Sequence, residues 1–573
     1  MIARYLDDIN DYKTVKHGEV SVYAKNQFTF IGPIRKEDGF CLNCFRDRLE
    51  EIELSDYYLN GDSAFLPSAL EKKIIEQYVD ELQTKNDQDL LYLIDWQTNE
   101  IKLMATFKRG NCEVCSNDAQ QIDSVEGRKE QKFDSLNPRQ ESWGNVKAKI
   151  DRRKQLVYNS RLSIVNRVNR SADSFGLPMV ETEVHQNKVS LLSYGRTSTY
   201  EKSRYTSILE SLERYATAFP YKLSPWHFKE AEHDRMDLTL SEIMELSDLD
   251  KGEYTPNTPV YYREVDALHS DDKVLIPEQL IYFDSHHISN EKRYIFDSSN
   301  GSALGSTVDE ASLYALLELF ERDAFLSTWY GKIPPTRINC DSIDSEKIQN
   351  YMIAMKKIGI KVHLFDISME LKIPTIWVLL EKINPGEADM AFYTAAATSF
   401  DLEDAIEKSL IEATTAISVF ANVFQKQEYK VRKKELLEDP LKVSRLEDHL
   451  LLYSNKEASE YLSFALETAY EMDFREIQQD YVHFAGNTSD VLDYFHRIVC
   501  RNSTKAYRAV TENPNLEKIG FVNVKYIVPE MLTMTFGHQN RRIVYSRIEK
   551  AIRTKGRGQL DRNWTENVPH PFP

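Results

Sequence analysis

Two stretches of the chain carry a Glu-x-x-Glu-Arg pattern inside largely apolar sequence, and this pattern limits the fold more than any other feature. At 3.6 residues per helical turn, the two glutamates and the arginine of each stretch lie on one face of a helix. A pair of carboxylates in apolar surroundings is costly unless cations or hydrogen bonds compensate it. Two such pairs indicate that a divalent metal ion, bound together with a phosphate, supplies the compensation. The six residues are Glu210, Glu213, Arg214, Glu318, Glu321 and Arg322.

Taken alone, a Glu-x-x-Glu-Arg stretch on a helix is usually a solvated charged stripe. The flanking sequence argues for a site instead. Residues 299–307 form a polar, glycine-containing turn that would cap the second helix and point its amides outward. Residues 195–199 form a similar polar turn with a cation before the first helix. Because the arrangement occurs twice, we expect a functional site at these two helices.

Composition limits the class of protein. The chain has 573 residues, too many for one ordinary core, so two or more domains are expected. Its hydrophobic content of 42% and aromatic content of 11% are those of a folded protein. A formal charge of −18 argues against general binding to nucleic acid or to anionic membranes. Because the sequence shows neither a signal peptide nor an apolar run of about 18–20 residues, we expect a cytoplasmic location.

Four of the six cysteines form two Cys-x-x-Cys pairs that lie far apart in the chain. In a reducing compartment, two such pairs fit a tetrahedral zinc site better than disulfides. Four thiolate ligands leave no open position, so the zinc would be structural, and the long gap requires a folded insertion between the pairs. Redox-active or free thiols are the alternative. The four residues are Cys41, Cys44, Cys112 and Cys115.

We predict three parts along the chain. Residues 1–116 form a zinc-binding domain, residues 117–153 a charged linker, and residues 154–573 a large domain in which helices alternate with strands. This pattern predicts an α/β fold of mixed α+β character, with helices packed on mixed sheets and a smaller α/β domain before them. In the large domain the expected helices cover 200–217, 307–330, 345–357, 402–422, 456–471 and 487–511, and the expected strands cover 361–366, 375–380 and 521–528.

The usual nucleotide-binding motifs do not occur. The sequence contains no Gly-x-x-x-x-Gly-Lys-Ser/Thr loop and no Gly-x-Gly-x-x-Gly fingerprint between a strand and a helix. If phosphates bind, they must be held by carboxylate-chelated Mg2+ and by arginines, with Arg196, Arg214 and Arg322 as the candidates.

At these residues the chain resembles the YcaO family. Residues 195–215 follow the first nucleotide-binding block of that family, and residues 299–323 follow the second. Residues 528–537 are similar to its later strand-and-turn signature. Residues 568–573, Val-Pro-His-Pro-Phe-Pro, resemble the Pro-x-Pro-x-Pro tail of the YcaO cyclodehydratases that make thiazole- and oxazole-modified, bacteriocin-type peptides. Residues 1–116 are similar to the zinc-binding region found beside or fused to such enzymes.

The resemblance implies an enzyme that binds ATP with Mg2+ and activates a backbone amide of a ribosomally synthesised precursor peptide. A Cys, Ser or Thr side chain attacks the preceding carbonyl carbon, ATP phosphorylates the resulting oxyanion, and phosphate departs to leave a thiazoline or oxazoline ring. By position, the resemblance assigns Mg2+ to Glu210, Glu213, Glu310, Glu318 and Glu321. It assigns further nucleotide contacts to Arg196, Thr206, Arg214, Ser306, Arg322 and Glu412.

The resemblance also places the C-terminal tail near the active site, where the Pro573 carboxylate or His570 would serve proton transfer. Alternating prolines favour this, since they pre-set an extended conformation at low entropic cost. Residues 1–40 are too short to hold a leader-binding winged-helix domain. We therefore expect a separate leader-binding protein as a partner, a flavin-dependent dehydrogenase as a further one, and a homodimer as a candidate assembly.

The chain departs from the family pattern after Glu412, where a Gln and a following Arg are absent near Thr415. Two other functions stay open. One is a different amide activation, such as thioamide formation with external sulfide, and the other is a non-catalytic scaffold that presents a peptide to a partner enzyme. The proline-rich tail favours cyclisation over thioamide formation, and the intact glutamate pairs argue against a scaffold.

Overall fold

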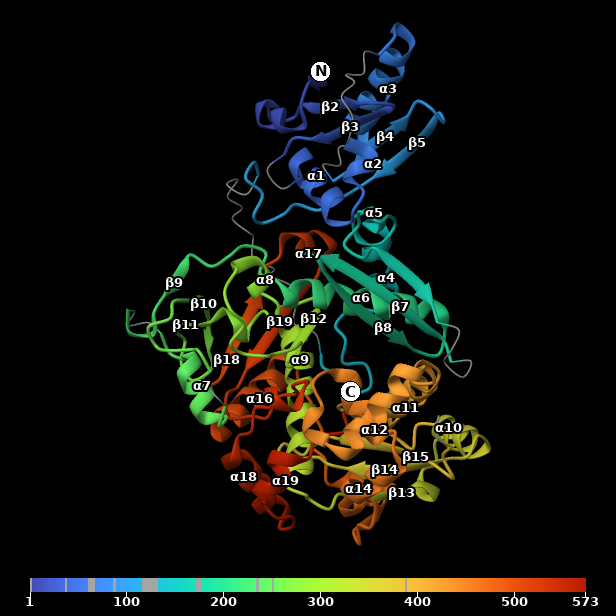
Figure 1. Cartoon of the computed structure of the whole chain (residues 1–573), viewed down its shortest axis with the longest axis vertical. Helices are drawn as coiled ribbons and strands as arrows, with labels where there is room; N and C mark the ends of the chain where they lie inside the picture. Colours follow the sequence, from blue (N-terminus) through green and yellow to red (C-terminus); the bar gives the residue numbers. More distant parts are fainter. Residues whose placement is uncertain are drawn as a thin grey trace.

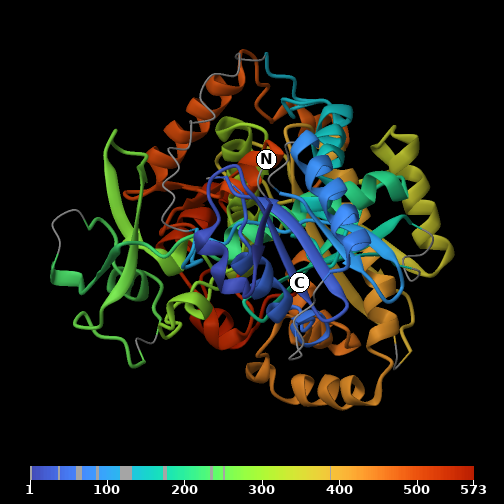
Figure 2. The same ribbon diagram turned by 90° about the horizontal axis from the view of Figure 1, so that it is seen from above.

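The computed structural model describes residues 3–36, 39–59, 67–85, 89–115, 132–171, 177–232, 236–249, 252–386 and 389–572. They build a small N-terminal module, residues 3–115, and a larger body that lies below it in Figure 1. Seen from above, the module lies over the middle of the larger body (Figure 2). Helices pack on sheets with both parallel and antiparallel pairs, which confirms the mixed α/β fold class. Among the described residues, no helix is long and apolar enough to cross a membrane.

The N-terminal module is a five-stranded sheet with helices on both faces. Side chains alternate along each strand, so Phe30 and Leu93 face the helix α1, whereas Ile31 and Ile94 face the helix α3. In sheet order the strands are β1 (Ala3–Leu6), β2 (Val20–Lys25), β3 (Phe28–Ile34), β4 (Leu91–Asp95) and β5 (Glu100–Met104), with α1 (Leu42–Glu51) and α3 (Ala69–Lys85).

A three-stranded antiparallel sheet begins the larger body, and the first helix of the Glu-x-x-Glu-Arg pattern packs on it. Where the sequence predicts a linker, residues 116–131 lie outside the described part, and the rest includes a folded helix. That helix buries Ile150 and packs Trp143 and Val146 on the same core, a spacing that gives one apolar face within a polar stretch. The elements are α4 (Trp143–Arg152), α5 (Lys154–Val157), β6 (Arg167–Arg170), β7 (Met179–Gln186), β8 (Val189–Arg196) and α6 (Tyr200–Ala218).

A six-stranded sheet forms the centre of the body and ends at β12, which leads directly into α9. The helix predicted over 487–511 stops at Asn502, because residues 507–511 alternate between buried and half-buried side chains and pair with β19 as a strand. The strands are β9 (Trp226–Phe228), β10 (Val260–Ala267), β11 (Lys273–Pro277), β12 (Ser302–Gly305), β18 (Tyr507–Thr511) and β19 (Val522–Ile527). Helices α7 (Leu240–Leu246), α8 (His286–Ser289), α9 (Val308–Tyr330), α16 (Thr488–Asn502) and α17 (Pro514–Ile519) accompany them.

A second five-stranded sheet, in the order β16-β15-β14-β13-β17, completes the body. Helix α9 links it to the central sheet, since Leu313 and Phe320 belong to one core and Phe325 and Trp329 to the next. The elements are β13 (Thr336–Asn339), α10 (Glu346–Lys357), β14 (Ile360–Asp366), β15 (Thr375–Lys382), β16 (Phe392–Thr398), α11 (Leu402–Val423), α12 (Gln427–Glu438), α13 (Leu446–Tyr453), α14 (Ser459–Leu466), β17 (Glu471–Asp473), α15 (Phe474–Gln479), α18 (Tyr545–Lys555) and α19 (Arg562–Asn567).

Candidate functional site

The two Glu-x-x-Glu-Arg helices lie on either side of strand β12, and both turn their glutamates toward it. Glu213 on α6 accepts a hydrogen bond from the Leu304 amide at 3.3 Å. Glu318 on α9 accepts one from the Ser302 amide of the same strand. Because a single short strand separates the helices, their carboxylates meet beside it in half-buried positions.

The other carboxylates of the set are held by strand ends. Glu210 accepts a hydrogen bond from the Tyr194 amide of β8 at 2.9 Å and pairs with Arg214 at 2.9 Å. Glu321 accepts one from the Thr398 amide, at the end of β16, also at 2.9 Å. These backbone contacts fix one oxygen of each glutamate, and the other oxygen faces an arginine, Arg214 or Arg322.

Two arginines and a third helix complete the cluster. Arg322 lies 3.2 Å from Glu321 and 3.7 Å from Glu318. Glu412, on α11, pairs with Arg196 from the end of β8 at 3.4 Å. The chain lacks the Gln and Arg that the family has near Thr415. Arg196, a cation from another element, lies beside this part of α11 instead. We call Glu210, Glu213, Glu318, Glu321 and Glu412, with Arg196, Arg214 and Arg322, the glutamate cluster.

The cluster holds five carboxylates and three arginines, so its carboxylates outnumber its guanidinium groups. Burial raises the pKa of Glu213 well above its usual value, and the neighbouring Glu318 and Glu210 raise it further. Burial also raises the pKa of Glu318, with Arg322 offsetting part of the effect. Burial raises the pKa of Glu321 to about 7, where Arg322 opposes the shift and Glu412 adds to it. Carboxylates held in this way favour binding of further cations.

The carboxylates of the cluster lie farther apart than the ligands of a metal site built from protein alone, as expected where a bound nucleotide supplies the remaining ligands of the metal ion. Among the described residues, three or more metal-ligating atoms lie within 4.8 Å of one another only in a four-cysteine group and in an Asp-His-His group. The glutamate cluster is thus more open than an all-protein metal cage. Mg2+ is usually held by one or two carboxylates together with substrate phosphates, which matches an open set of glutamates flanked by arginines.

Other residues assigned to the site have different surroundings. Glu310 is 3% exposed, and its two oxygens contact the Ser306 amide at 3.0 Å and Arg139 at 3.1 Å. Glu310 thus lies in the first turn of α9 and Ser306 just before it, where the Thr307 side chain caps the helix by accepting from the Glu310 amide. Thr206 is half-buried on α6. Metal or nucleotide binding by these three residues stays a prediction.

Two cations near the cluster escaped the sequence-based prediction. Arg139 contacts Leu304 O at 3.2 Å, and its charge acts on Glu213 as well as on Glu310. Lys525, on β19, is 1% exposed, contacts Asp297 at 3.4 Å and lies near enough to Glu318 for the two charges to interact. A lone lysine inside an apolar strand is the signal that could have identified the second of them.

The C-terminal tail reaches the glutamate cluster. Phe572 is 1% exposed; its ring centre lies 4.6 Å from the Arg322 guanidinium and 4.8 Å from the ring of Phe325. His570 donates from Nε2 to Thr535 O at 3.0 Å, and His449 donates from Nδ1 to His570 O at 2.7 Å. Burial lowers the pKa of His570 well below its usual value, so its ring anchors the tail as a neutral group. Pro573 lies outside the described residues.

We expect Phe572→Ala to lower both stability and nucleotide affinity. Truncating a buried phenylalanine costs about 3–5 kcal/mol in unfolding free energy. Loss of the ring beside Arg322 is expected to raise the KM for ATP roughly tenfold. Phe572→Leu keeps most of the apolar volume, so it should retain stability and still raise the KM. An unchanged KM in both variants would contradict a role of the tail at the arginine.

Two buried histidines near the tail predict an acid-sensitive fold. Burial lowers the pKa values of His449 and His538 to about 4. Between the ordinary value of about 6.5 and pH 4, the unfolded chain binds protons that the folded chain does not, so stability falls as the pH falls. His449 alone should contribute about 3 kcal/mol to this loss. Urea unfolding at several pH values measures it, and His449→Gln should flatten the curve.

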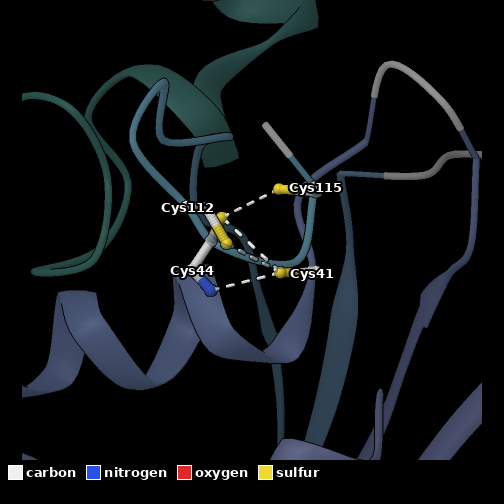
Figure 3. Close-up of side chains that lie close together, drawn as sticks. All are labelled: Cys41, Cys44, Cys112 and Cys115. Carbon is white, nitrogen blue, oxygen red and sulfur yellow. Dashed lines mark hydrogen bonds between the residues drawn. The ribbon is translucent and has the colours of Figure 1, made fainter. Parts of the chain in front are cut away.

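The four cysteines of the two Cys-x-x-Cys pairs meet in the N-terminal module (Figure 3). Their sulfur atoms lie 3.7 Å apart for Cys41–Cys44 and 3.4 Å apart for both Cys41–Cys112 and Cys44–Cys115. A tetrahedron of sulfurs at about 2.3 Å from a metal has edges of about 3.8 Å, so the arrangement fits one ion with four thiolates. Buried in this way, the cluster can hold a metal ion.

Comparison with known proteins decides the family. The model of YcaO, described as YcaO cyclodehydratase, ATP- and Mg2+-binding, matches residues 194–532, which contain the whole glutamate cluster. The chain belongs to the YcaO family. Membership confirms the predicted family and the predicted enzyme class, an ATP-dependent cyclodehydratase.

Solved structures share the fold of this YcaO protein. A heterocyclase in complex with substrate and cofactor gives a TM-score of 0.66 at 16% identity, covering 93% of this chain and 77% of that one. The heterocyclase TruD gives 0.64 at 15% identity, covering 100% and 79%. YcaO from Methanopyrus kandleri, bound with AMPPCP and Mg2+, gives 0.52 at 15% identity, covering 72% and 96%.

One curated relative is also similar. An uncharacterised protein from Methanothermobacter thermautotrophicus is 20% identical over 244 residues, which cover 42% of this chain. The chain spans 61% of the length of that relative.

Proposed function

We propose that this YcaO protein catalyses ATP-dependent cyclodehydration of Cys, Ser or Thr residues in a ribosomally synthesised precursor peptide. The observation that carries the proposal is the glutamate cluster, in which five buried or half-buried carboxylates from three helices converge with three arginines. The rings formed would be thiazolines or oxazolines. Two solved structures with the same fold are heterocyclases, which supports this chemistry over other uses of the cluster.

The reaction needs a better leaving group than an amide oxygen. The side-chain sulfur or oxygen of the peptide attacks the preceding carbonyl carbon and leaves an oxyanion there. This oxyanion takes the terminal phosphoryl group of ATP, and phosphate then departs as the amide nitrogen loses its proton, which closes the C=N bond. The net change is loss of one water from the peptide and conversion of ATP into ADP and phosphate.

The chain's own residues would bind and orient the nucleotide. Arg196, Arg214 and Arg322 offer guanidinium groups that match phosphate oxygens. Mg2+ held by Glu210, Glu213, Glu318 and Glu321 would neutralise phosphate charge during transfer. The ring of Phe572 packs against the guanidinium of Arg322 and would hold this arginine in place whether or not the peptide substrate is bound.

We further propose that the four-cysteine site holds structural zinc and that the chain divides into a zinc-binding part, a connector and a YcaO domain near the predicted boundaries. The partners would be the precursor peptide and a separate leader-binding protein, with a flavin-dependent dehydrogenase to oxidise the rings. A cytoplasmic location would keep the four cysteines reduced and able to bind zinc as thiolates.

The test incubates the protein with a precursor peptide, the leader-binding partner and Mg-ATP and follows peptide mass. We expect loss of one water per ring, with ADP and phosphate released. Replacement of oxygen by sulfur in the presence of sulfide would instead assign thioamide formation. ATP hydrolysis absent with and without peptide would assign the scaffold function.

A further inference from the structure

A second group of metal-ligating side chains lies between β11 and β12, beyond the glutamate cluster. Asp284, His286 and His287 each offer one ligand atom, and the three atoms lie within 4.8 Å of one another. The group includes no thiolate and is separate from the four cysteines. Two imidazoles and one carboxylate suit Zn2+, Co2+, Ni2+ or Cu2+ better than Mg2+.

The backbone holds the three side chains in a fixed turn. The Phe283 amide donates to Thr217 O at 3.3 Å and the Asp284 amide donates to Ala218 O at 2.9 Å, which ties the segment to the last turn of α6. The His287 amide donates to Asp284 O at 3.1 Å. Each histidine thus projects from the same short turn as the carboxylate.

The Asp284 carboxylate does not form a hydrogen bond with Arg293, its nearest cation. Arg293 lies 3.8 Å from Asp284, too far for a hydrogen bond. Its guanidinium instead donates to the carbonyl oxygens of Ile295 at 3.4 Å and Asp297 at 3.1 Å. The Arg293 guanidinium therefore lies beside Asp284 without donating a hydrogen bond to its carboxylate.

The setting also favours a cation. The turn sits at the C-terminal end of α6, where the helix dipole carries partial negative charge. Asp284 and His286 are half-buried and His287 is exposed, so an ion can enter from solvent and keep water as a further ligand.

We propose that Asp284, His286 and His287 bind one divalent transition-metal ion, with at least one coordination position left to water or to an added ligand. The ion would fix the turn at residues 284–287, whose backbone is hydrogen-bonded to the end of α6, the helix that carries Glu210 and Glu213. Since it binds the folded chain only, it would stabilise this junction according to its concentration and affinity.

The test uses the full chain with its four-cysteine site loaded with Zn2+ and excess metal removed. Co2+ is then titrated as the probe into the wild type, into H286Q/H287Q and into the control H17Q. His17 is exposed in the N-terminal module and belongs to none of the metal-ligating groups of the described residues. Bound cobalt is counted by elemental analysis and followed by visible absorption.

We expect one further equivalent of Co2+ in the wild type and in H17Q, with visible d–d bands and no thiolate charge-transfer bands. H286Q/H287Q should bind it at least about 100-fold more weakly, since even outer-shell changes cost about 10–100-fold. Equal binding in H286Q/H287Q, no binding to the wild type, or cobalt that shows thiolate bands would overturn the proposal.

Discussion

Replacement of Glu318 and Glu321 together by glutamine is expected to abolish ATP-dependent water loss from the peptide, with a fall of at least about 1,000-fold in rate. Removal of one preorganised electrostatic contact to a transition state typically costs about 100- to 1,000-fold, and this variant removes two. Both carboxylates lie beside Arg322, on the face of α9 that meets β12 and β16. Peptide mass spectrometry and release of phosphate measure the loss.

The same variant should be at least as stable as the wild type. Both glutamates have a raised pKa because burial disfavours their charge, and neighbouring carboxylates add to this at Glu321, so neutral glutamines relieve that cost. Glu549→Gln, on an exposed face of α18, is the matched control and should leave both rate and stability unchanged. A double variant that unfolds at lower denaturant concentration would show that the pair is structural.

Loss of the zinc ligands is expected to unfold the N-terminal module. Structural zinc contributes about 10–16 kcal/mol to the folding of small zinc domains, more than a module of this size gains from its core. The Cys44→Ser/Cys112→Ser variant removes one ligand from each pair, on α1 and on the loop after β5. We expect one fewer equivalent of bound zinc and rapid amide hydrogen exchange in α1.

The control for the zinc prediction is Cys340→Ser. Cys340 is half-buried in the larger body and lies outside the four-cysteine group. It should keep the zinc and the slow exchange of α1. Wild-type zinc content in the double cysteine variant would contradict the assignment of these thiols as the ligands.

Some of this site follows from local sequence, and some does not. The positions i, i+3 and i+4 share a helix face in any helix, so Glu318, Glu321 and Arg322 could be placed together without a structure. Their burial followed from the apolar residues around them. That α6 and α9 meet across β12 could not be read from spacing, because the contact joins distant segments.

Other details of the structure could not be read from the sequence. Thr307 caps α9 by accepting a hydrogen bond from the Glu310 amide, and the Glu310 carboxylate contacts the Ser306 amide and Arg139. The contact with Arg139 joins segments that lie far apart in the chain, so residue spacing does not predict it. Lys525 was not singled out, because only the apolar residues of its strand were used to predict it. Residues 507–511 were predicted as part of a helix, but that helix ends at Asn502.

The most direct test of the account is Mg2+-dependent binding of a non-hydrolysable ATP analogue, measured by calorimetry on the wild type and on E318Q/E321Q. We expect binding by the wild type that disappears when Mg2+ is chelated, and no Mg2+-dependent binding by the folded double variant. Equal affinity and equal Mg2+ dependence in both proteins would contradict the claim that these glutamates hold the nucleotide's metal ion.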